Sequence, residues 1–283
     1  MPPTNVETLL APWSGCILER RYRLGRVVGR GGFGTVFEGR HLTLDVPIAV
    51  KVLHLTPESI GPDRHAEALA SFTEEARIIA RLRHPSIVSV LDSGITSAAE
   101  LGRPEGDTAE PLADASVPVP WFVLEWCDGT ALDVDLDDRR GAGGRSVEET
   151  WRLLRPIVEA VAYGHEQGIV HRDIKPSNVM LVPGARERIL PRLLDFGIAK
   201  HMEADELPGS GLTMTQSTRR SFTPAYAATE QFIGGRTGPW TDVYALGLLF
   251  VEVLTDAMPY GTESPALGRS EEHTSELQSP LNI

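Results

Sequence analysis

The chain has 283 residues, and 27 Lys and Arg against 39 Asp and Glu give it a formal net charge of −12. This acidic balance, with no dense run of basic residues, excludes the phosphate-neutralising surface that nucleic-acid binding requires. A hydrophobic fraction of 41% is typical of a globular protein and excludes wholesale disorder. The length suits two domains or one larger two-lobed unit.

Cysteine usage and terminal composition bear on the cellular compartment. Only two cysteines occur, Cys16 and Cys127, and their separation supports neither a disulfide framework nor a zinc site. Residues Met1–Leu10 lack the basic start and apolar core of a signal peptide. The longest apolar run, Tyr244–Leu254, is too short to span a bilayer and contains Glu252. We therefore expect a cytoplasmic protein with no membrane segment within this chain.

The first part of the chain is expected to be rich in strands. Short β-prone runs separated by glycines and turn residues predict strands at Tyr22–Val28, Thr35–Gly39, Pro47–Val52, Ile87–Leu91 and Trp121–Trp126. Apolar residues at helical spacing, among them Phe72, Ala76 and Ile79, predict a helix over Ala66–Leu82. The polar segment Thr96–Pro118 has no periodicity, which predicts a disordered insertion over about 96–118.

The pattern becomes helical after Gly144. Ser146, followed three residues later by Glu149, predicts a capped helix start. An apolar stripe follows at helical spacing: Trp151, Leu154, Ile157, Val158 and Val161. A second helix, over Asp242–Leu254, has the composition of one buried on every side. Strands followed by helices predict an α+β fold with a small β-rich lobe and a larger, mainly helical lobe.

Glycines recur at short spacing after the first predicted strand: Gly29, Gly31 and Gly34. Such spacing lets the backbone approach phosphates and present N–H groups to them, although a plain tight hairpin is the alternative. Lys51 then lies in a β-prone run, with Ala49 on the same side of the strand. A lysine that points inward needs an anionic partner, such as Glu75 or a bound phosphate. A solvated strand face is the other interpretation.

Two polar segments in the second half carry the strongest chemical signal. His171–Asn178 gathers an acid, bases and an amide just after a predicted helix that ends at Gly168. Asp195 opens an Asp-Phe-Gly run directly after the predicted strand Ile189–Leu194. An amide and a carboxylate at the ends of neighbouring strands are hard oxygen ligands that suit Mg²⁺. A solvated loop and an ordinary turn are the alternatives.

The chain resembles the catalytic domain of Ser/Thr protein kinases in four motifs, which occur in the family's order and at its usual separations. They are the Gly-rich segment, the strand lysine, the His-Arg-Asp loop with its asparagine, and the Asp-Phe-Gly run. The resemblance covers about Tyr22–Gly268, and the run Asp-Ile-Lys-Pro-Ser-Asn is most similar to bacterial members. It implies a protein kinase-like two-lobed fold, with the N-lobe over about 22–125, the C-lobe over about 128–268 and an N-terminal leader over 1–21.

The resemblance also implies a role for each candidate residue. Asp173 would accept the proton of a substrate hydroxyl, and Lys175 would neutralise the γ-phosphoryl group, as is typical of Ser/Thr kinases. Lys51 would hold the α- and β-phosphates and pair with Glu75. The remaining residues would bind ATP (Gly29, Gly31, Gly34, Val36, Ala49, Glu125, Cys127 and Met180) or Mg²⁺ (Asn178 and Asp195).

Regulation and partners are further expectations from the resemblance. Arg172, beside Asp173, would dock a phosphate carried by the following loop. The hydroxyl residues of that loop are Thr213, Thr215, Ser217 and Thr218. A polar loop with incidental hydroxyl groups is the alternative. We expect protein substrates that carry Ser or Thr, self-association for trans-autophosphorylation and no nucleic acid.

The sequence departs from the family pattern in two places. Thr229 stands where the family run Ala-Pro-Glu has proline, which we expect to weaken the substrate-binding segment without abolishing it. The chain stops before further helices of the family, so we expect an incomplete C-lobe, reduced activity and no downstream arginine for Glu230. Arg269–Ser279 resembles a translated sequencing adapter. We therefore expect an artefactual tail over 269–283 and native sequence that ends near Gly268.

Three functional classes remain open at this point. An ATP-dependent Ser/Thr protein kinase is favoured by the complete set Lys51, Asp173, Asn178 and Asp195. A non-catalytic, ATP-binding pseudokinase or scaffold gains weight from Thr229 and from the missing helices. A small-molecule phosphotransferase of related fold is disfavoured by the long segment that leads to Ala228-Thr229-Glu230 and by Lys175-Pro176.

Overall fold

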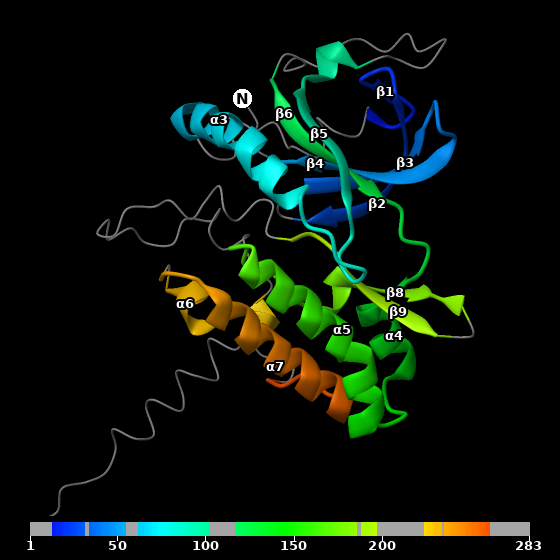
Figure 1. Ribbon diagram of the computed structural model, residues 1–283, viewed down its shortest axis with the longest axis vertical. Helices are drawn as coiled ribbons and strands as arrows, with labels where there is room; N and C mark the ends of the chain where they lie inside the picture. The colour runs from blue at the N-terminus through cyan, green and yellow to red at the C-terminus, as the bar shows by residue number, and fades with distance from the viewer. Residues whose placement is uncertain are drawn as a thin grey trace, which may run out of the picture. The chain divides into compact units, whose positions relative to one another are not determined.

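The computed structural model describes residues 13–31, 34–54, 62–101, 117–185, 188–196, 224–233 and 235–260. The chain divides into two compact units. Unit 1 contains the described residues up to Arg83 together with Val88–Cys127, and unit 2 contains His84–Ile87 and the described residues from Asp128 onward. Figure 1 shows a curled sheet in unit 1 and mainly helices in unit 2, as the α+β prediction requires.

Unit 1 is built on a six-stranded antiparallel sheet in the order β1-β2-β3-β4-β6-β5. Its strands are β1 (Ile17–Leu18), β2 (Tyr22–Gly31), β3 (Gly34–His41), β4 (Val46–Leu53), β5 (Val90–Thr96) and β6 (Val119–Glu125). Helix α3 (Pro62–Ile79) packs Phe72 against Phe122 of β6, with ring centroids 5.0 Å apart. The predicted meander and helix are confirmed, and α3 begins earlier than predicted because proline suits a first helical turn.

Strand β5 corrects the prediction of a strand over Ile87–Leu91. The strand begins at Val90 and continues through Asp92, Ser93 and Gly94, residues whose composition resembles a turn. A Cβ atom on Gly94 would lie 2.3 Å from the Trp121 ring, so glycine is required where this tryptophan packs on the strand. The turn-like composition here reflects packing across the sheet and not a chain reversal.

The two segments predicted to lie outside the folded lobe are partly packed into it. Trp13, Cys16 and Leu18, within the predicted leader, are buried in the main apolar cluster of unit 1. Part of the predicted disordered insertion is regular structure, since Thr96 ends β5 and the 3-10 helix η2 (Ala98–Glu100) follows it. Leu101 joins the same apolar cluster. Residues 102–116 lie outside the described part of the chain.

Unit 2 combines a small sheet with helices. The sheet has the order β7-β8-β9 and consists of β7 (Thr130–Ala131), β8 (Val179–Pro183) and β9 (Ile189–Leu193). The helices are α4 (Leu132–Arg139), α5 (Val147–Glu166), α6 (Thr229–Phe232) and α7 (Pro239–Thr255), with 3-10 turns η3 (Pro176–Asn178) and η6 (Pro224–Tyr226). None of the helices in the described part combines the length and apolar composition needed to span a bilayer.

Helices α5 and α7 lie side by side in opposite directions (Figure 1). The capped start of α5 is confirmed: Ser146 Oγ accepts a hydrogen bond from the Glu149 N–H at 3.2 Å, and the Ser146 N–H donates to Glu149 Oε2 at 2.9 Å. Near the start of α5, Trp151 lies 6.2 Å from the ring of Phe250. Near its end, His165 contacts Asp242. These contacts at both ends define the antiparallel packing.

Both helices are less buried than predicted. Trp151, expected in the apolar stripe of α5, is 50% exposed, and Val243 on α7 is 62% exposed. Leu249 and Val253 are fully buried, so α7 has one buried face and is not enclosed on every side. Composition alone does not separate these cases, because an apolar residue indicates which faces of a helix can be buried, and packing decides which faces are. The described part of unit 2 leaves one face of α7 uncovered.

Candidate active site

The strand register of unit 1 brings predicted ligand-binding residues onto one face of its sheet. Val36 of β3 lies opposite both Gly29 of β2 and Lys51 of β4. Ala49 shares this face, because residues two apart in a strand, and residues paired across antiparallel strands, point the same way. Lys51 is only 8% exposed. Lys51 is therefore an inward-pointing lysine and not part of a solvated strand face.

The glycines of the β2–β3 hairpin have a structural reason of their own. Gly31 pairs with Gly34 at the end of the hairpin. A Cβ atom on Gly34 would lie 2.5 Å from the carbonyl oxygen of Val52, so strand β4 alone requires glycine there. The hairpin interpretation and the phosphate interpretation therefore both remain compatible with this glycine. Residues 32–33, at the hairpin tip, lie outside the described part.

Three further predicted residues of unit 1 are located in or beside regular elements. Glu75 lies in α3, and its pairing with Lys51 stays a prediction. Glu125 ends β6, and its N–H donates to the carbonyl oxygen of Ser89 at 3.1 Å. The backbone group that Glu125 could offer to a ligand is therefore its carbonyl oxygen. Cys127 follows in the connecting segment and is partly buried.

In unit 2, Asp173, Lys175 and Asn178 form one hydrogen-bonded group. Lys175 Nζ lies 3.0 Å from Asp173 Oδ2, and the two side chains are 22% and 17% exposed. Asn178 Nδ2 donates to the Asp173 carbonyl oxygen at 2.7 Å and to Asp173 Oδ2 at 3.2 Å. The carboxylate is thus held in one orientation by a cation and an amide. Fixed orientation is what a general base requires.

Asn178 and Asp195 lie at adjacent strand ends. Asn178 precedes β8 and Asp195 follows β9, and the Leu194 N–H donates to the Asn178 carbonyl oxygen at 2.8 Å. Asp195 has a φ of 54°, in the left-handed region, a conformation that costs about 1 kcal/mol or more and is typical of functional sites. Met180, two residues after Asn178, pairs with Ala131 of β7 in the same sheet.

The donors at these strand ends fit a magnesium ion chemically. Because Asn178 Nδ2 is bonded to Asp173, the amide oxygen of Asn178 is its group for a cation, and Asp195 supplies a carboxylate. Within the described residues, no group of three or more His, Cys, Asp or Glu could hold a metal ion. Mg²⁺ usually binds through one or two protein groups plus water and phosphate oxygens, so two donors suffice.

His171 lies fully buried beneath the loop. Its Nε2 lies 2.8 Å from the Leu194 carbonyl oxygen, and the Asp173 N–H donates to its Nδ1 at 3.2 Å. A carbonyl oxygen can only accept, so Nε2 carries the hydrogen and Nδ1 does not. Burial lowers the pKa of His171, against the opposing attraction of Asp242, which agrees with a neutral ring. His171 therefore acts as a neutral link between the loop and the end of β9.

Asp242, in the first turn of α7, holds the backbone of the loop His171–Asn178, the candidate catalytic loop. Its Oδ2 accepts from the His171 N–H at 2.8 Å, and its Oδ1 accepts from the Arg172 N–H at 2.7 Å. His165 Nε2 lies 2.7 Å from the same Oδ2. The Asp242 side chain is fully buried. In the sequence, Asp242 is an acid at the start of an apolar helix, which by itself does not indicate this role.

The arrangement agrees with what the comparisons with known proteins show. Residues 22–280 match the sequence model of the protein kinase domain. The chain belongs to the protein kinase family. The kinase domain of PknI from Mycobacterium tuberculosis shares its fold, with a TM-score of 0.58 and 27% identity over 87% of this chain and 76% of that chain. The two-lobed kinase fold is thereby confirmed.

Curated relatives of this kinase domain are named as serine/threonine-protein kinases. A protein named "probable serine/threonine-protein kinase" from Streptomyces coelicolor is 34% identical over 92% of this chain and 34% of its own length. The serine/threonine-protein kinase pkn2 of Myxococcus xanthus is 32% identical over 97% of this chain and 29% of its own length. This chain therefore spans about a third of the length of these relatives.

The segment after the predicted substrate-binding region holds contacts that the sequence did not indicate. Thr229, in place of the family proline, is the first residue of α6. Glu230 Oε1 accepts a hydrogen bond from the Thr241 hydroxyl at 2.7 Å, so this carboxylate has a partner within the chain. The predicted phosphorylation loop and the adapter-like tail lie outside the described residues.

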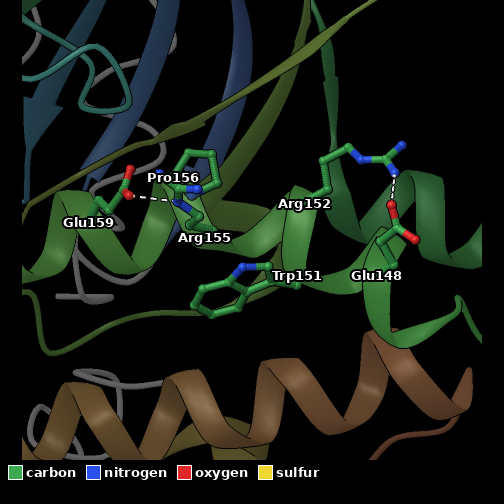
Figure 2. Close-up of a pocket in the computed structure, with 6 residues that line it drawn as sticks. All are labelled: Glu148, Trp151, Arg152, Arg155, Pro156 and Glu159. Carbon is green, nitrogen blue, oxygen red and sulfur yellow. Dashed lines mark hydrogen bonds and ion pairs between the residues drawn. The ribbon is translucent and has the colours of Figure 1, made fainter.

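A shallow groove of about 380 Å³ on α5 contains none of the predicted site residues (Figure 2). Trp151 and Pro156 line it between two ion pairs, Arg152 with Glu148 and Arg155 with Glu159, each at 2.8 Å. Exposed pairs of this kind contribute at most about 1 kcal/mol each. The groove is a surface feature of α5 and is separate from the kinase site residues.

Proposed function

We propose that the chain is an ATP-dependent protein serine/threonine kinase that transfers the γ-phosphoryl group of Mg-ATP to Ser or Thr hydroxyls of proteins. The observation that carries the proposal is the group formed by Asp173, Lys175 and Asn178, with the carboxylate held at 3.0 Å from the ammonium. The names of the curated relatives support the same activity.

The catalytic loop would act on the acceptor. In this proposal Asp173 accepts the hydroxyl proton of the substrate as the oxygen–phosphorus bond forms and the bond between the β,γ-bridging oxygen and the γ-phosphorus breaks. Lys175 counters the charge on the transferred group, and the position of this lysine two residues after Asp173 is the feature that favours Ser/Thr substrates. Phosphoryl transfer requires little covalent work from a protein, so orientation and charge provide most of the rate.

Residues of both units would bind the nucleotide and its metal ion. Asn178 and Asp195 would bind Mg²⁺, which neutralises phosphate charge when it is present. Lys51 would hold the α- and β-phosphates, supported by Glu75. The backbones of Gly29, Gly31 and Gly34 would also contact phosphates. The adenine ring would be bound by Val36, Ala49 and Met180 and by backbone groups of Glu125 and Cys127.

The proposal also covers regulation by phosphorylation and the cellular location of the protein. Arg172 would dock a phosphate on the loop that carries Thr213–Thr218, formed by trans-autophosphorylation between two copies. The acidic net charge and the two distant cysteines support a cytoplasmic protein that acts on other proteins.

The direct test uses the full chain with Mg²⁺, γ-labelled ATP and a mixed Ser/Thr/Tyr peptide acceptor. We expect label on phosphoserine and phosphothreonine, and almost none when Asp173→Asn replaces the base. ATP binding without transfer by the wild-type chain would favour the pseudokinase interpretation. Equal transfer by the wild-type and Asp173→Asn chains would contradict the role of Asp173, and transfer only to small-molecule hydroxyls would contradict protein substrates.

A further inference from the structure

Helix α6 carries two neighbouring side chains that bond in different directions. Glu230 accepts a hydrogen bond from Thr241 of α7 at 2.7 Å. Gln231 Nε2 donates to the carbonyl oxygen of Arg172 at 3.0 Å, while Gln231 Oε1 accepts from the Ala228 N–H at 3.1 Å. Helix α6 is therefore bonded to α7 by one residue and to the catalytic loop by the next.

The two partners of Gln231 determine which way its amide points. The Ala228 N–H can only donate, so it requires the amide oxygen. The Arg172 carbonyl can only accept, so it requires the amide nitrogen. Only one orientation of the Gln231 amide satisfies both groups, and the bridge joins segments 59 positions apart in the sequence.

The carbonyl that Gln231 contacts belongs to the peptide plane that leads into Asp173. Arg172 has a φ of 65°, a left-handed conformation that a non-glycine residue keeps only when its surroundings enforce it. Asp242 holds the Arg172 N–H on one side of the residue, and Gln231 holds its carbonyl on the other. The N–H of the Arg172–Asp173 peptide donates to His171 Nδ1 at 3.2 Å. Gln231 and His171 thus hold the two ends of one peptide plane.

We propose that Gln231 is a positioning residue for the general base, because its amide keeps the Arg172–Asp173 peptide plane, and with it the Asp173 carboxylate, in the orientation for proton transfer. This inference rests on the proposed kinase function for its kinetic consequence only. Its structural consequence, a fixed peptide plane, is testable whether or not the chain transfers phosphate.

The sharpest variant is Gln231→Glu, which has nearly the same shape. A carboxylate still accepts the Ala228 N–H, but it has no hydrogen to donate to the Arg172 carbonyl and places negative charge against that oxygen. Gln231→Met keeps the length and removes both bonds. Gln167→Glu makes the same charge change on an exposed glutamine at the end of α5 and serves as the matched control.

The kinetic test measures peptide phosphorylation by the full chain. We expect kcat to fall about tenfold in Gln231→Glu and Gln231→Met, with the KM for ATP changed less than about twofold, since the lost bond acts on the base and not on the nucleotide. Gln167→Glu should match the wild type. An unchanged kcat in Gln231→Glu, or an equal loss in Gln167→Glu, would overturn the proposal.

Hydrogen exchange followed by mass spectrometry gives the second readout. The backbone amides of Arg172 and Asp173 should exchange faster in Gln231→Glu and Gln231→Met, while the amides of α5 stay as protected as in the wild type. Unchanged exchange in the loop overturns the proposal, even for a wild-type chain without transfer. If that wild-type chain shows no transfer but the variants show faster loop exchange, the kinase assignment fails and the positioning contact stands.

Discussion

The two regions that carry candidate functional residues are built in contrasting ways. In unit 1, Gly29, Val36 and Lys51 are neighbours across strands of a regular sheet, and the register alone brings them together. In unit 2, Asp173 lies on an irregular loop whose backbone is held by side chains from distant helices, above all by Asp242. The regular pairing of strands positions residues in a sheet, whereas a loop needs a specific partner for each buried backbone N–H and carbonyl group.

The contrast also separates two kinds of function. In the proposed function, the residues of unit 1 would bind the nucleotide, because a sheet face holds small and cationic side chains at fixed spacing. The loop of unit 2 would act on the acceptor, because several hydrogen bonds hold one carboxylate in one orientation. Variants of unit 1 should therefore change mainly the KM for ATP, and variants of the unit 2 loop should change mainly kcat.

The largest expected effect separates Asp173 from Lys51. In Asp173→Asn we expect kcat to fall about a thousandfold with ATP affinity nearly unchanged, because the base acts on the acceptor. In Lys51→Ala we expect the KM for ATP to rise about ten- to hundredfold through the loss of a charged contact. Steady-state kinetics and ATP titration measure both. An equal loss of ATP binding in both variants would contradict the separation of a nucleotide-binding region from a loop that acts on the acceptor.

The second largest expected effect comes from Asp242, the anchor of the loop backbone at His171 and Arg172. Asp242→Asn removes a buried carboxylate that accepts from His171, Arg172 and His165, and its amide group must turn one donor towards another donor. We expect the free energy of unfolding to fall by about 3 kcal/mol.

Urea denaturation of the full chain measures this loss. Asp138→Asn, the same change on an exposed acid of α4, is the control and should stay within about 0.5 kcal/mol of the wild type. Equal stability of Asp242→Asn and Asp138→Asn would show that the loop does not depend on its anchor.

A pH effect follows from the buried His171. Its pKa is lowered in the folded chain, so below about pH 6.5 the unfolded chain binds more protons than the folded chain, and stability falls as pH falls. One such group contributes a slope of up to about 1.4 kcal/mol per pH unit. Urea midpoints between pH 7.5 and 5.5 should show a smaller slope in His171→Phe than in the wild type. Parallel profiles would mean that this ring is not kept neutral.

The smallest expected effect concerns the N-terminal cap of helix α5. Ser146→Ala removes the hydroxyl that caps α5, and we expect a loss of about 1 kcal/mol in the free energy of unfolding. Ser146→Asp keeps an acceptor at the cap and should retain most of the stability. Denaturation curves of the two variants provide the measurement, and an equal loss in both would show that capping is not the cause.

Signals that act between near neighbours could be predicted from the sequence. Ser146 and Glu149 indicated the start of α5 because a capping box needs only residues three positions apart. The alternation of Ala49 and Lys51 indicated a shared face for the same reason. The order and spacing of the polar motifs then indicated the protein kinase family, which the match over residues 22–280 shows.

Packing between distant segments could not be predicted in this way. The sequence around Gly94 resembles a turn, but Trp121 requires glycine within strand β5. Trp151 has the spacing of a core residue and is half exposed, because no described segment covers that face of α5. For Gly94 the deciding partner lies far along the chain, and for Trp151 no described segment supplies one.

By itself, the sequence determined most strands of unit 1, the helices α3, α5 and α7, and the protein kinase family, since these depend on the composition, spacing and order of short segments. Only the tertiary structure decided that Asp242 and Gln231 hold the backbone on either side of Arg172, 70 and 59 positions away from it. The reason is physical. A buried N–H or carbonyl must find a partner, but its own sequence does not state which distant side chain satisfies it.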